Sequence, residues 1–281
     1  MKAKGTDLVV KSNKLVEASY RLDLMEQRLV LAAIVEGRES DLLLNNKPIK
    51  ISAKRFAAIF GLDESNAYRL MKEAKNRLYE RSVTIEDEED GSVGAVRWVE
   101  GVFHKDGDGF VKLKFSSYVA PHLARLETEY TEYRLEKIGK LTSAYAVRIY
   151  ELCAQCRNKD TKEREESLPD LRRKLGLTAT EYPAIDDFKR RVLDPAIKQI
   201  NTHTDLQISY ENVKTGRTVT GLLFSISEKT ATPEPTKKNA AKPPKITREY
   251  IEKNNLARAG ESWDETFRRL AEERGQQRLV D

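Results

Sequence analysis

A helix, a Gly-Leu turn and a second helix occur twice in this chain, and each copy is followed by a strand pattern. The first copy is AAIFGLDESNAYRLMKEAKNRL, and the second lies within PDLRRKLGLTATEYPAIDDFKRRVLDPAIKQI. The two copies align on Gly61-Leu62 and Gly176-Leu177. A single helix-turn-helix is common in globular proteins, whereas two with the same flanking pattern indicate a repeated unit.

The segments around each copy complete the order of a winged-helix domain, which is a helix, two further helices and a β-hairpin. In the first half, LDLMEQRLVLAAIVEGRE predicts a helix capped by Asp23, PIKIS a strand, and 82–86, 93–103 and 110–115 β-rich segments. In the second half, TSAYAVRIYELCAQCRNK predicts a helix capped by Thr142 or Ser143, and LQISYENVKTGRTVTGLLFSIS a hairpin. Pro195 should kink the last helix or shift its start.

The predicted fold class is therefore α+β, with two tandem winged-helix domains related by a repeat of pattern rather than of sequence. We place the domains at residues 8–128 and 129–227. Residues 228–281 form a predicted flexible tail, because EKTATPEPTKKNAAKPPK offers almost nothing to bury. Helical spacing returns at 247–274, with a helix start near Trp263, so the tail is either a small helical element or a segment that binds a partner.

Composition restricts the class of protein. The 50 basic and 45 acidic residues nearly cancel, leaving a net charge of +5, so any basic binding surface must be local. No apolar run approaches the roughly 20 residues of a membrane helix, and the N-terminal segment lacks the apolar core of a signal peptide. We therefore expect a cytoplasmic protein without a membrane partner. The 2 cysteines, Cys153 and Cys156, exclude a disulfide framework.

The second helix of each helix-turn-helix has a polar face suited to the DNA major groove, where base edges carry a donor and acceptor code. In the first motif Ala67, Leu70, Met71, Ala74 and Leu78 form the apolar stripe, and Ser65, Asn66, Arg69, Lys72 and Asn76 lie opposite. In the second, Ile185, Phe188, Val192 and Ala196 face the core, and Asp187, Arg190, Arg191, Asp194 and Lys198 face outward. Either face alone can be ordinary solvated surface, but the pair favours DNA.

Phosphate contacts are expected from basic residues near these helices, because such contacts add affinity without reading sequence. The candidates are Lys11 and Lys14 before the first helix, Arg172, Arg173 and Lys174 before the second turn, and Lys214 and Arg217 at the second hairpin tip. The acidic stretch EDEED at 86–90 would repel phosphate, so we expect it to point away from DNA.

Motifs for catalysis and cofactors are missing from the sequence. There is no phosphate-binding loop, since GKLTS has Arg134 where the leading glycine belongs. The three histidines are isolated, and Cys153 and Cys156 have no second pair for a zinc site, so core packing is their expected role. We expect no cofactor, no metal and no enzymatic activity.

Several stretches resemble the iteron-binding replication initiators of theta-replicating plasmids, the group that contains the F-plasmid initiator. VVKSNKLVEASYRLDLMEQRLVLAAI resembles the family's opening, and YTEYRLEKIGKLTSAYAVRIYELCAQ its domain junction. DFKRRVLDPAIKQINTHTDLQISY followed by KTGRTVTGLLFSI is similar to the second recognition helix and wing. The resemblance covers residues 8–227. Its specific part is Lys11-Ser12-Asn13 together with Glu26-Gln27-Arg28.

The resemblance implies a two-winged-helix protein that binds direct repeats (iterons) as a monomer, opens A·T-rich DNA and recruits host replication proteins. These partners include the replicative helicase, the host initiator and chaperones. A homodimer formed through the N-terminal domain would bind an inverted repeat and repress the protein's own gene. The family's basic triplet corresponds here to Lys189, Arg190 and Arg191. Helical spacing alone places Lys189 near the buried side.

Other functions remain open from the sequence. A winged-helix transcriptional repressor without a replication role would share these features, and only the DNA next to the gene separates the two. A rolling-circle nickase would need a histidine-held metal, for which the pattern is missing. The N-terminal helix at 24–37 is apolar on more than one face, which indicates either a central helix of its domain or a surface that also serves a dimer.

Overall fold

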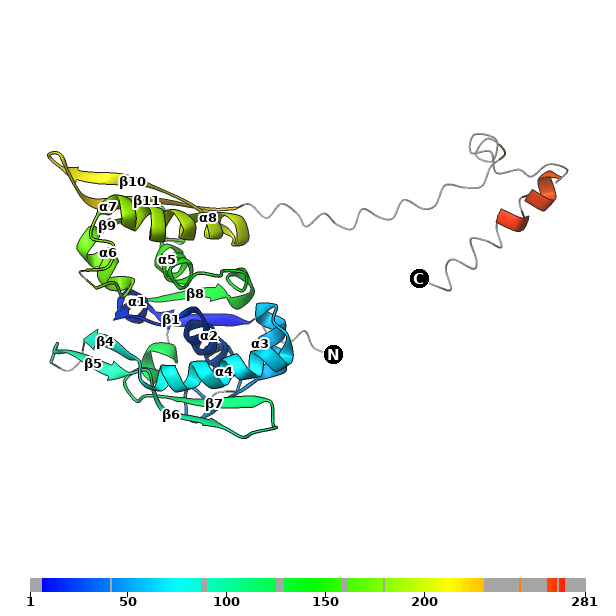
Figure 1. Ribbon diagram of the computed structural model, residues 1–281, viewed down its shortest axis with the longest axis horizontal. Helices are drawn as coiled ribbons and strands as arrows, with labels where there is room; N and C mark the ends of the chain where they lie inside the picture. Colours follow the sequence, from blue (N-terminus) through cyan, green and yellow to red (C-terminus); the bar gives the residue numbers. More distant parts are fainter. Residues whose placement is uncertain are drawn as a thin grey trace. The chain divides into compact units, whose positions relative to one another are not determined.

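The computed structural model describes residues 7–40, 42–86, 90–124, 129–157, 161–178 and 180–229, together with 248, 262–266 and 268–270. Residues 1–230 form one compact unit and 231–281 a second. Helices and strands are mixed throughout the first unit, as an α+β class requires. Its element order can be followed in Figure 1.

The first winged-helix domain is built on helices α2 (Leu24–Glu39), α3 (Ala53–Phe60) and α4 (Glu64–Tyr79). Its antiparallel sheet has the order β3-β7-β6, from strands Ile49–Ser52, Phe110–Phe115 and Val99–His104. The strand between α2 and α3 thus pairs with the last strand of the hairpin. Helix α2 begins with a capping box, because Asp23 and Glu26 bond to each other's backbone amides.

The second domain repeats this arrangement. Helix α5 (Ala144–Ala154) is followed by β9 (Glu163–Ser167), α6 (Leu168–Lys174), a helical stretch over 185–203, and the hairpin β10 (Leu206–Thr215) and β11 (Thr218–Glu228). The sheet order β10-β11-β9 matches the first domain element for element. Ser143, one of the two expected caps, accepts the bond from the amide of Ala146. The prediction of two tandem winged helices is confirmed.

The two aligned glycines end the first helix of each motif in the same backbone conformation. Gly61 has φ +63° and Gly176 φ +68°, in the left-handed region that favours glycine. The preference of glycine for the left-handed conformation therefore explains why the two Gly-Leu pairs align at the same turn.

The second recognition helix runs from Ile185 to His203 in three parts. These are α7 (Ile185–Phe188), a π-helical turn (Lys189–Leu193) and α8 (Asp194–His203). Pro195 lies in the first turn of α8, where its missing N–H costs least. The expected disturbance by Pro195 thus takes the form of a π-helical turn that precedes it.

The segment 93–103 is β-rich, as expected, but it contains two strands that belong to different sheets. Strand β5 (Val93–Arg97) pairs with β4 (Ser82–Glu86), and β4 pairs with β2 (Ser19–Tyr20), so these three form a separate sheet. Trp98 is fully buried at the change of sheet. The wing of the first domain is therefore the β6–β7 hairpin, and the acidic stretch 86–90 belongs to the β4–β5 hairpin, with 87–89 outside the described residues.

A two-stranded ribbon lies between the two domains in Figure 1. It consists of β1 (Leu8–Ser12) and β8 (Tyr130–Arg134), paired antiparallel. Helix α1 (Asn13–Glu17) follows β1, and the short 3₁₀ helices Ala120–Leu123 and Leu135–Lys137 flank β8. These elements contact both halves of the chain, so they do not mark where one domain ends and the next begins. The boundary at 128/129 stays a prediction.

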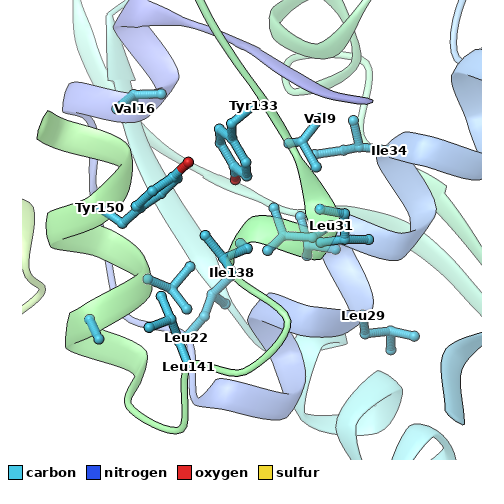
Figure 2. Packing of buried hydrophobic residues seen from close by; sticks show 14 of the residues in the cluster. Val9, Val16, Leu22, Leu29, Leu31, Ile34, Tyr133, Ile138, Leu141 and Tyr150 are labelled. Atoms are coloured by element: carbon cyan, nitrogen blue, oxygen red, sulfur yellow. The ribbon is translucent and has the colours of Figure 1, made fainter. Parts of the chain in front are cut away.

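Helix α2 lies in the centre of the core. Residues 29 to 35 of α2 are all buried, with exposures of 2% or less. Figure 2 shows Leu31 and Ile34 packed near Val9 of β1 and Tyr133 of β8. The apolar character of α2 on several faces is therefore explained within a single chain, and dimerisation stays a prediction.

The second unit is described only in part. Residues 263–266 are helical, and Ser262 and Glu265 exchange backbone and side-chain bonds at the start of this turn. The helix start expected near Trp263 is thus present, whereas the stretch expected to be disordered lies mostly outside the described residues. No helix in the described part of the chain is long and apolar enough to cross a membrane.

Candidate nucleic-acid interface

Helix α4 presents the polar face that the sequence predicted. Ala67, Met71, Ala74 and Leu78 are buried against the core, whereas Leu70 is only half-buried. Ser65, Asn66, Arg69 and Asn76 are exposed, and Lys72 is half-buried. Asp63 caps the helix through the amide of Asn66 at 3.1 Å. The five candidate residues therefore lie on one surface.

These side chains of α4 are held by partners within the chain. Lys72 Nζ lies 2.6 Å from Asp106 Oδ1 at the β6–β7 turn. Arg69 bonds Glu73 at 2.7 Å and the Asn66 side chain at 2.8 Å. The bond from Lys72 lowers the pKa of Asp106 and keeps it charged. A phosphate that contacts Lys72 must therefore compete with a carboxylate of the wing.

The second recognition helix exposes basic side chains, which share its surface with Asp186, Asp187 and Asp194. The side chains of Arg190 and Arg191 are 71% and 61% exposed. Both extend toward Asp187, with Arg190 at 2.5 Å and Arg191 at 3.7 Å. Lys198 is exposed about two turns further on. Phe188, Val192 and Ala196 face the core as predicted, and Ile185 is half-buried.

Lys189 occupies the edge of this helix next to the wing. It is half-buried, donates to Asn212 Oδ1 at 2.6 Å and lies 5.7 Å from the ring centre of Tyr210. Both partners are on β10. Lys189 thus ties the recognition helix to its hairpin, in agreement with the helical spacing that placed it near the buried side.

The tip of the β10–β11 hairpin carries Lys214 and Arg217, both exposed, around Gly216 at φ +62°. Among the described residues neither side chain makes an ion pair. Arg173 is also exposed, 3.5 Å from Asp170. These positions suit phosphate contacts, which need accessible charges rather than fixed geometry.

Two residues expected to contact phosphate are buried instead. Lys11 is 3% exposed and bonds Glu151 at 2.6 Å, and Lys174 bonds Glu166 at 2.8 Å. Those two predictions are wrong, because hydrophobic periodicity cannot distinguish an exposed lysine from one with a buried carboxylate. Arg172 is half-buried and lies 5.1 Å from the ring centre of Phe188. Lys14, by contrast, is exposed on α1.

The sequence reasoning missed the wing of the first domain. The β6–β7 turn places Lys105, Asp106 and Asp108 beside α4, and Tyr68 of α4 donates to the carbonyl of Lys105 at 2.9 Å. The signal was the KDGDG turn, whose glycines have φ of +86° and +61°. The β-rich pattern over 93–103 does not show where one strand ends and the next begins, so it did not identify this turn as a wing tip.

The cysteines are part of the core. Cys153 and Cys156 are buried and unpaired, and burial raises the pKa of the Cys153 thiol to about 12. No group of three or more histidine, cysteine or carboxylate residues suitable for a metal ion occurs in the described part of the chain.

Comparison with protein families identifies this arrangement. Residues 8–154 match the first winged helix of initiator replication proteins, and residues 167–226 match the second winged helix of the same initiators. The chain belongs to the initiator replication protein family. Residues 155–166 lie between the two matched ranges.

Relatives from Escherichia coli agree with this assignment. A replication initiation protein is 25% identical over 224 residues, which cover 78% of this chain and 69% of the relative. The PI protein is 23% identical over 246 residues, covering 75% of this chain and 80% of that protein. An uncharacterized 27.6 kDa protein is 26% identical over 232 residues, covering 79% and 94%.

One solved structure shares the fold over most of the chain. The Pi initiator protein, crystallised in complex with iteron DNA, matches with a TM-score of 0.65 and 20% identity. The match covers 80% of this chain and 98% of that one. The fold of two successive winged helices is thus found in both proteins.

Proposed function

We propose that this protein starts plasmid replication by binding iterons as a monomer, with α4 and the α7–α8 helix in successive major grooves. The observation that carries the proposal is the exposed basic face of Arg190, Arg191 and Lys198 on the recognition helix of a repeated winged-helix fold. The iteron complex of the Pi initiator supports it by likeness of fold. Two helices in one chain can read an asymmetric site, which can be repeated head to tail.

The proposal includes three further steps that the family suggests. Binding opens A·T-rich DNA beside the iterons, and the bound protein recruits host replication proteins such as the helicase, the initiator and chaperones. A homodimer represses the protein's own gene at an inverted repeat. All of this takes place in the cytoplasm. The alternative is a transcriptional repressor without a replication role. If a plasmid with this origin replicates when the gene is present and fails to replicate when the gene is deleted, that alternative is excluded.

Removing a base-reading arginine is expected to weaken binding to the iteron. Arg190→Ala or Arg191→Ala should cost about 1–3 kcal/mol, since a bidentate guanine contact is of that order. Arg69→Ala should act likewise on the other half of the site. Fluorescence anisotropy with an iteron duplex and with a random duplex measures both affinities. Equal losses on the two duplexes would mean that these arginines contact phosphate only.

Removing the carboxylate that holds Lys72 is expected to strengthen binding. Asp106→Asn frees Lys72 for phosphate and removes a negative charge near DNA, so affinity should rise roughly two- to fivefold at low salt. Asp108→Asn on the same turn is the matched control, because Asp108 pairs with Lys105 at 3.3 Å and not with α4. An equal gain in both variants would show a general charge effect rather than the release of Lys72.

Binding should need neither nucleotide nor metal, because the sequence has no motif for either. The purified protein is expected to shift an origin fragment equally with and without a chelator, in the absence of ATP. Incubation with a supercoiled origin plasmid and Mg²⁺ provides the second arm. Nicked plasmid in that arm would contradict the proposal and favour a nickase.

A further inference from the structure

Residues 13–21, which we name the strap, contact both winged helices. The strap comprises α1, β2 and Arg21. On one side Ser19 and Tyr20 pair with Thr84 and Val83 of β4. Strand β4 begins at Ser82, three residues after the first recognition helix ends at Tyr79. The strap is therefore joined to the end of α4 through a hydrogen-bonded strand.

The other side of the strap contacts the second helix-turn-helix. Ser19 Oγ donates to the carbonyl of Arg173 at 2.9 Å, and Arg21 donates to Glu181 at 3.0 Å. The turn at Gly176 comes so close that a Cβ there would lie 2.5 Å from the carbonyl oxygen of Tyr20. The residues that the strap contacts here precede the second recognition helix, which begins at Ile185.

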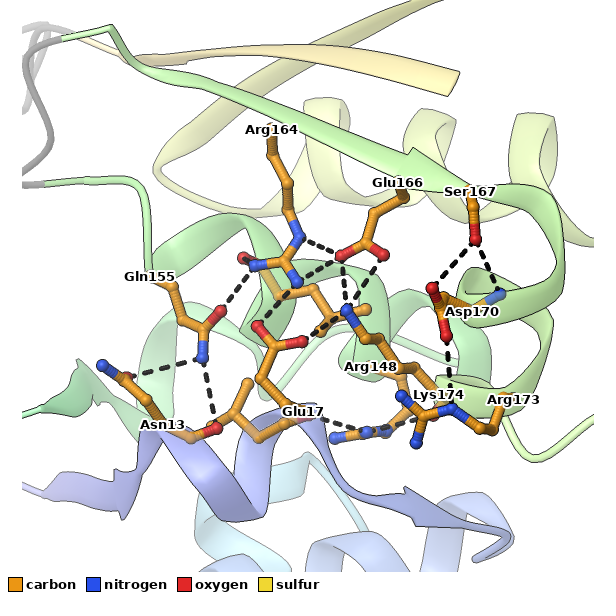
Figure 3. A network of polar contacts seen from close by, with 12 residues as sticks. Asn13, Glu17, Arg148, Gln155, Arg164, Glu166, Ser167, Asp170, Arg173 and Lys174 are labelled. Carbon is orange, nitrogen blue, oxygen red and sulfur yellow. Dashed lines mark hydrogen bonds and ion pairs between the residues drawn. The ribbon is translucent and has the colours of Figure 1, made fainter. Parts of the chain in front are cut away.

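Buried and half-buried charges hold the strap on α6 and β9, as Figure 3 shows. Glu17 lies 2.5 Å from Lys174 Nζ and 2.6 Å from Arg164 Nη2. Both cations also bond Glu166. Burial raises the pKa of Glu17, but the bonds from Lys174 and Arg164 outweigh it, so the net pKa is lowered and Glu17 is charged at neutral pH.

One guanidinium fixes the strap backbone and the end of α6 at the same time. Arg148 is 2% exposed, and its Nη2 donates to the carbonyls of Val16 at 2.9 Å, Ala18 at 3.1 Å and Lys174 at 3.0 Å. Nη2 has two hydrogens, so at least two of these three carbonyls share one, and the group bonds to the strap and to the end of α6 together.

From these contacts we propose that the strap fixes the separation and rotation of the two recognition helices, with Glu17 as a positioning residue. The protein then accepts a single spacing between the two DNA segments that it reads. One added base pair moves the second segment by about 3.4 Å and rotates it by a tenth of a turn. A rigid pair of helices cannot follow such a change, whereas a loosened pair can. The inference rests on the proposed binding by both helices.

The test uses the full-length protein and selection from a duplex library of random sequence. The parent should select two sequence blocks at one spacing, and it should lose at least about tenfold in affinity when one base pair is inserted between them. Glu17→Gln should select the same blocks at several spacings and lose less than about threefold on insertion. Glu228→Gln, which removes an exposed ion pair with Arg157 within the second domain, is the matched control and should behave as the parent.

The outcomes separate the inference from the proposed function. A parent that selects no second block contradicts binding by both helices. A parent with two blocks and a Glu17→Gln variant with the same single spacing overturns the role of the strap. A loss of affinity at every spacing without a change in preference shows a structural role only, and it also overturns the inference.

A second measurement works without DNA. Spin labels at Glu73→Cys on α4 and Thr202→Cys on α8 report the distance between the helices, and both positions are exposed. The distance distribution should be narrow in the parent and broad in Glu17→Gln. If Glu17→Gln does not fold, Arg21→Gln, which removes the exposed contact with Glu181, replaces it. Arg21→Gln should then broaden the distance distribution between the two labels. An unchanged distribution overturns the inference.

Discussion

Glu151→Gln is expected to lower the free energy of unfolding by about 3–5 kcal/mol, the cost of removing one partner from a buried ion pair. Glu151 is 1% exposed and accepts bonds from Lys11 at 2.6 Å, Tyr133 at 2.6 Å and Arg148 at 3.0 Å. Burial raises the pKa of Glu151, but the charges of Lys11 and Arg148 outweigh it and lower the pKa. Glutamine keeps the shape and removes the charge on which both cations depend.

Urea unfolding followed by circular dichroism measures this loss. Glu80→Gln, which removes the exposed pair with Arg97, should change stability by less than about 1 kcal/mol. The double variant Lys11→Met with Glu151→Gln should cost less than the sum of the two single variants, because it leaves no lysine unpaired. A loss below about 1 kcal/mol in Glu151→Gln would show that the pair is hydrated or dispensable.

The same cluster shows why the sequence motif and the binding surface differ. In the sequence, Lys11-Ser12-Asn13 was the start of the stretch that carried the resemblance, and the charge of Lys11 suggested phosphate contacts. In the structure Lys11 is buried on Glu151, Ser12 caps α1 through the amide of Leu15, and Asn13 accepts a bond from Thr131. The motif thus serves the junction of the domains.

The second part of that motif follows the same rule. Arg28 of α2 is buried and donates to the carbonyls of Gly139 and Leu141 at 3.3 and 3.0 Å. Gln27 donates to the carbonyl of Leu22 at 3.1 Å. The sequence pattern could not assign these roles, because the partners lie more than 100 residues away for Arg28 and are backbone atoms. Only the assembled fold brings them together.

Helical periodicity was sufficient for the recognition helices. The stripe at Ala67, Met71 and Ala74 follows the 3.6-residue period, so the opposite polar face follows from the amino-acid sequence alone. The same reasoning put Lys189 beside the core. It did not find the wing of the first domain, because strands β5 and β6 are continuous in sequence and separate only at Trp98. Which strands pair depends on contacts that no local pattern records.

Gly176→Ala is expected to be among the most destabilising substitutions in the second helix-turn-helix. Two effects add. The residue has φ +68°, where a side chain costs about 1–2 kcal/mol. The new Cβ would also lie 2.5 Å from the carbonyl oxygen of Tyr20 and 2.9 Å from Cβ of Arg21, so the strap or the turn must move, which costs about 1–3 kcal/mol more.

Gly61→Ala is the matched control, because the repeat places Gly61 at the same turn of the first domain. Its φ is +63°, but nothing lies within 4 Å of the Cβ that alanine would add. Gly61→Ala should therefore show only the backbone cost, and the difference between the two variants isolates the contact between turn and strap. Urea midpoints of both variants give that difference. Equal losses of stability in the two variants would mean that the turn at Gly176 shifts at no cost in free energy. The close approach to Tyr20 would then add nothing to the stability of the junction.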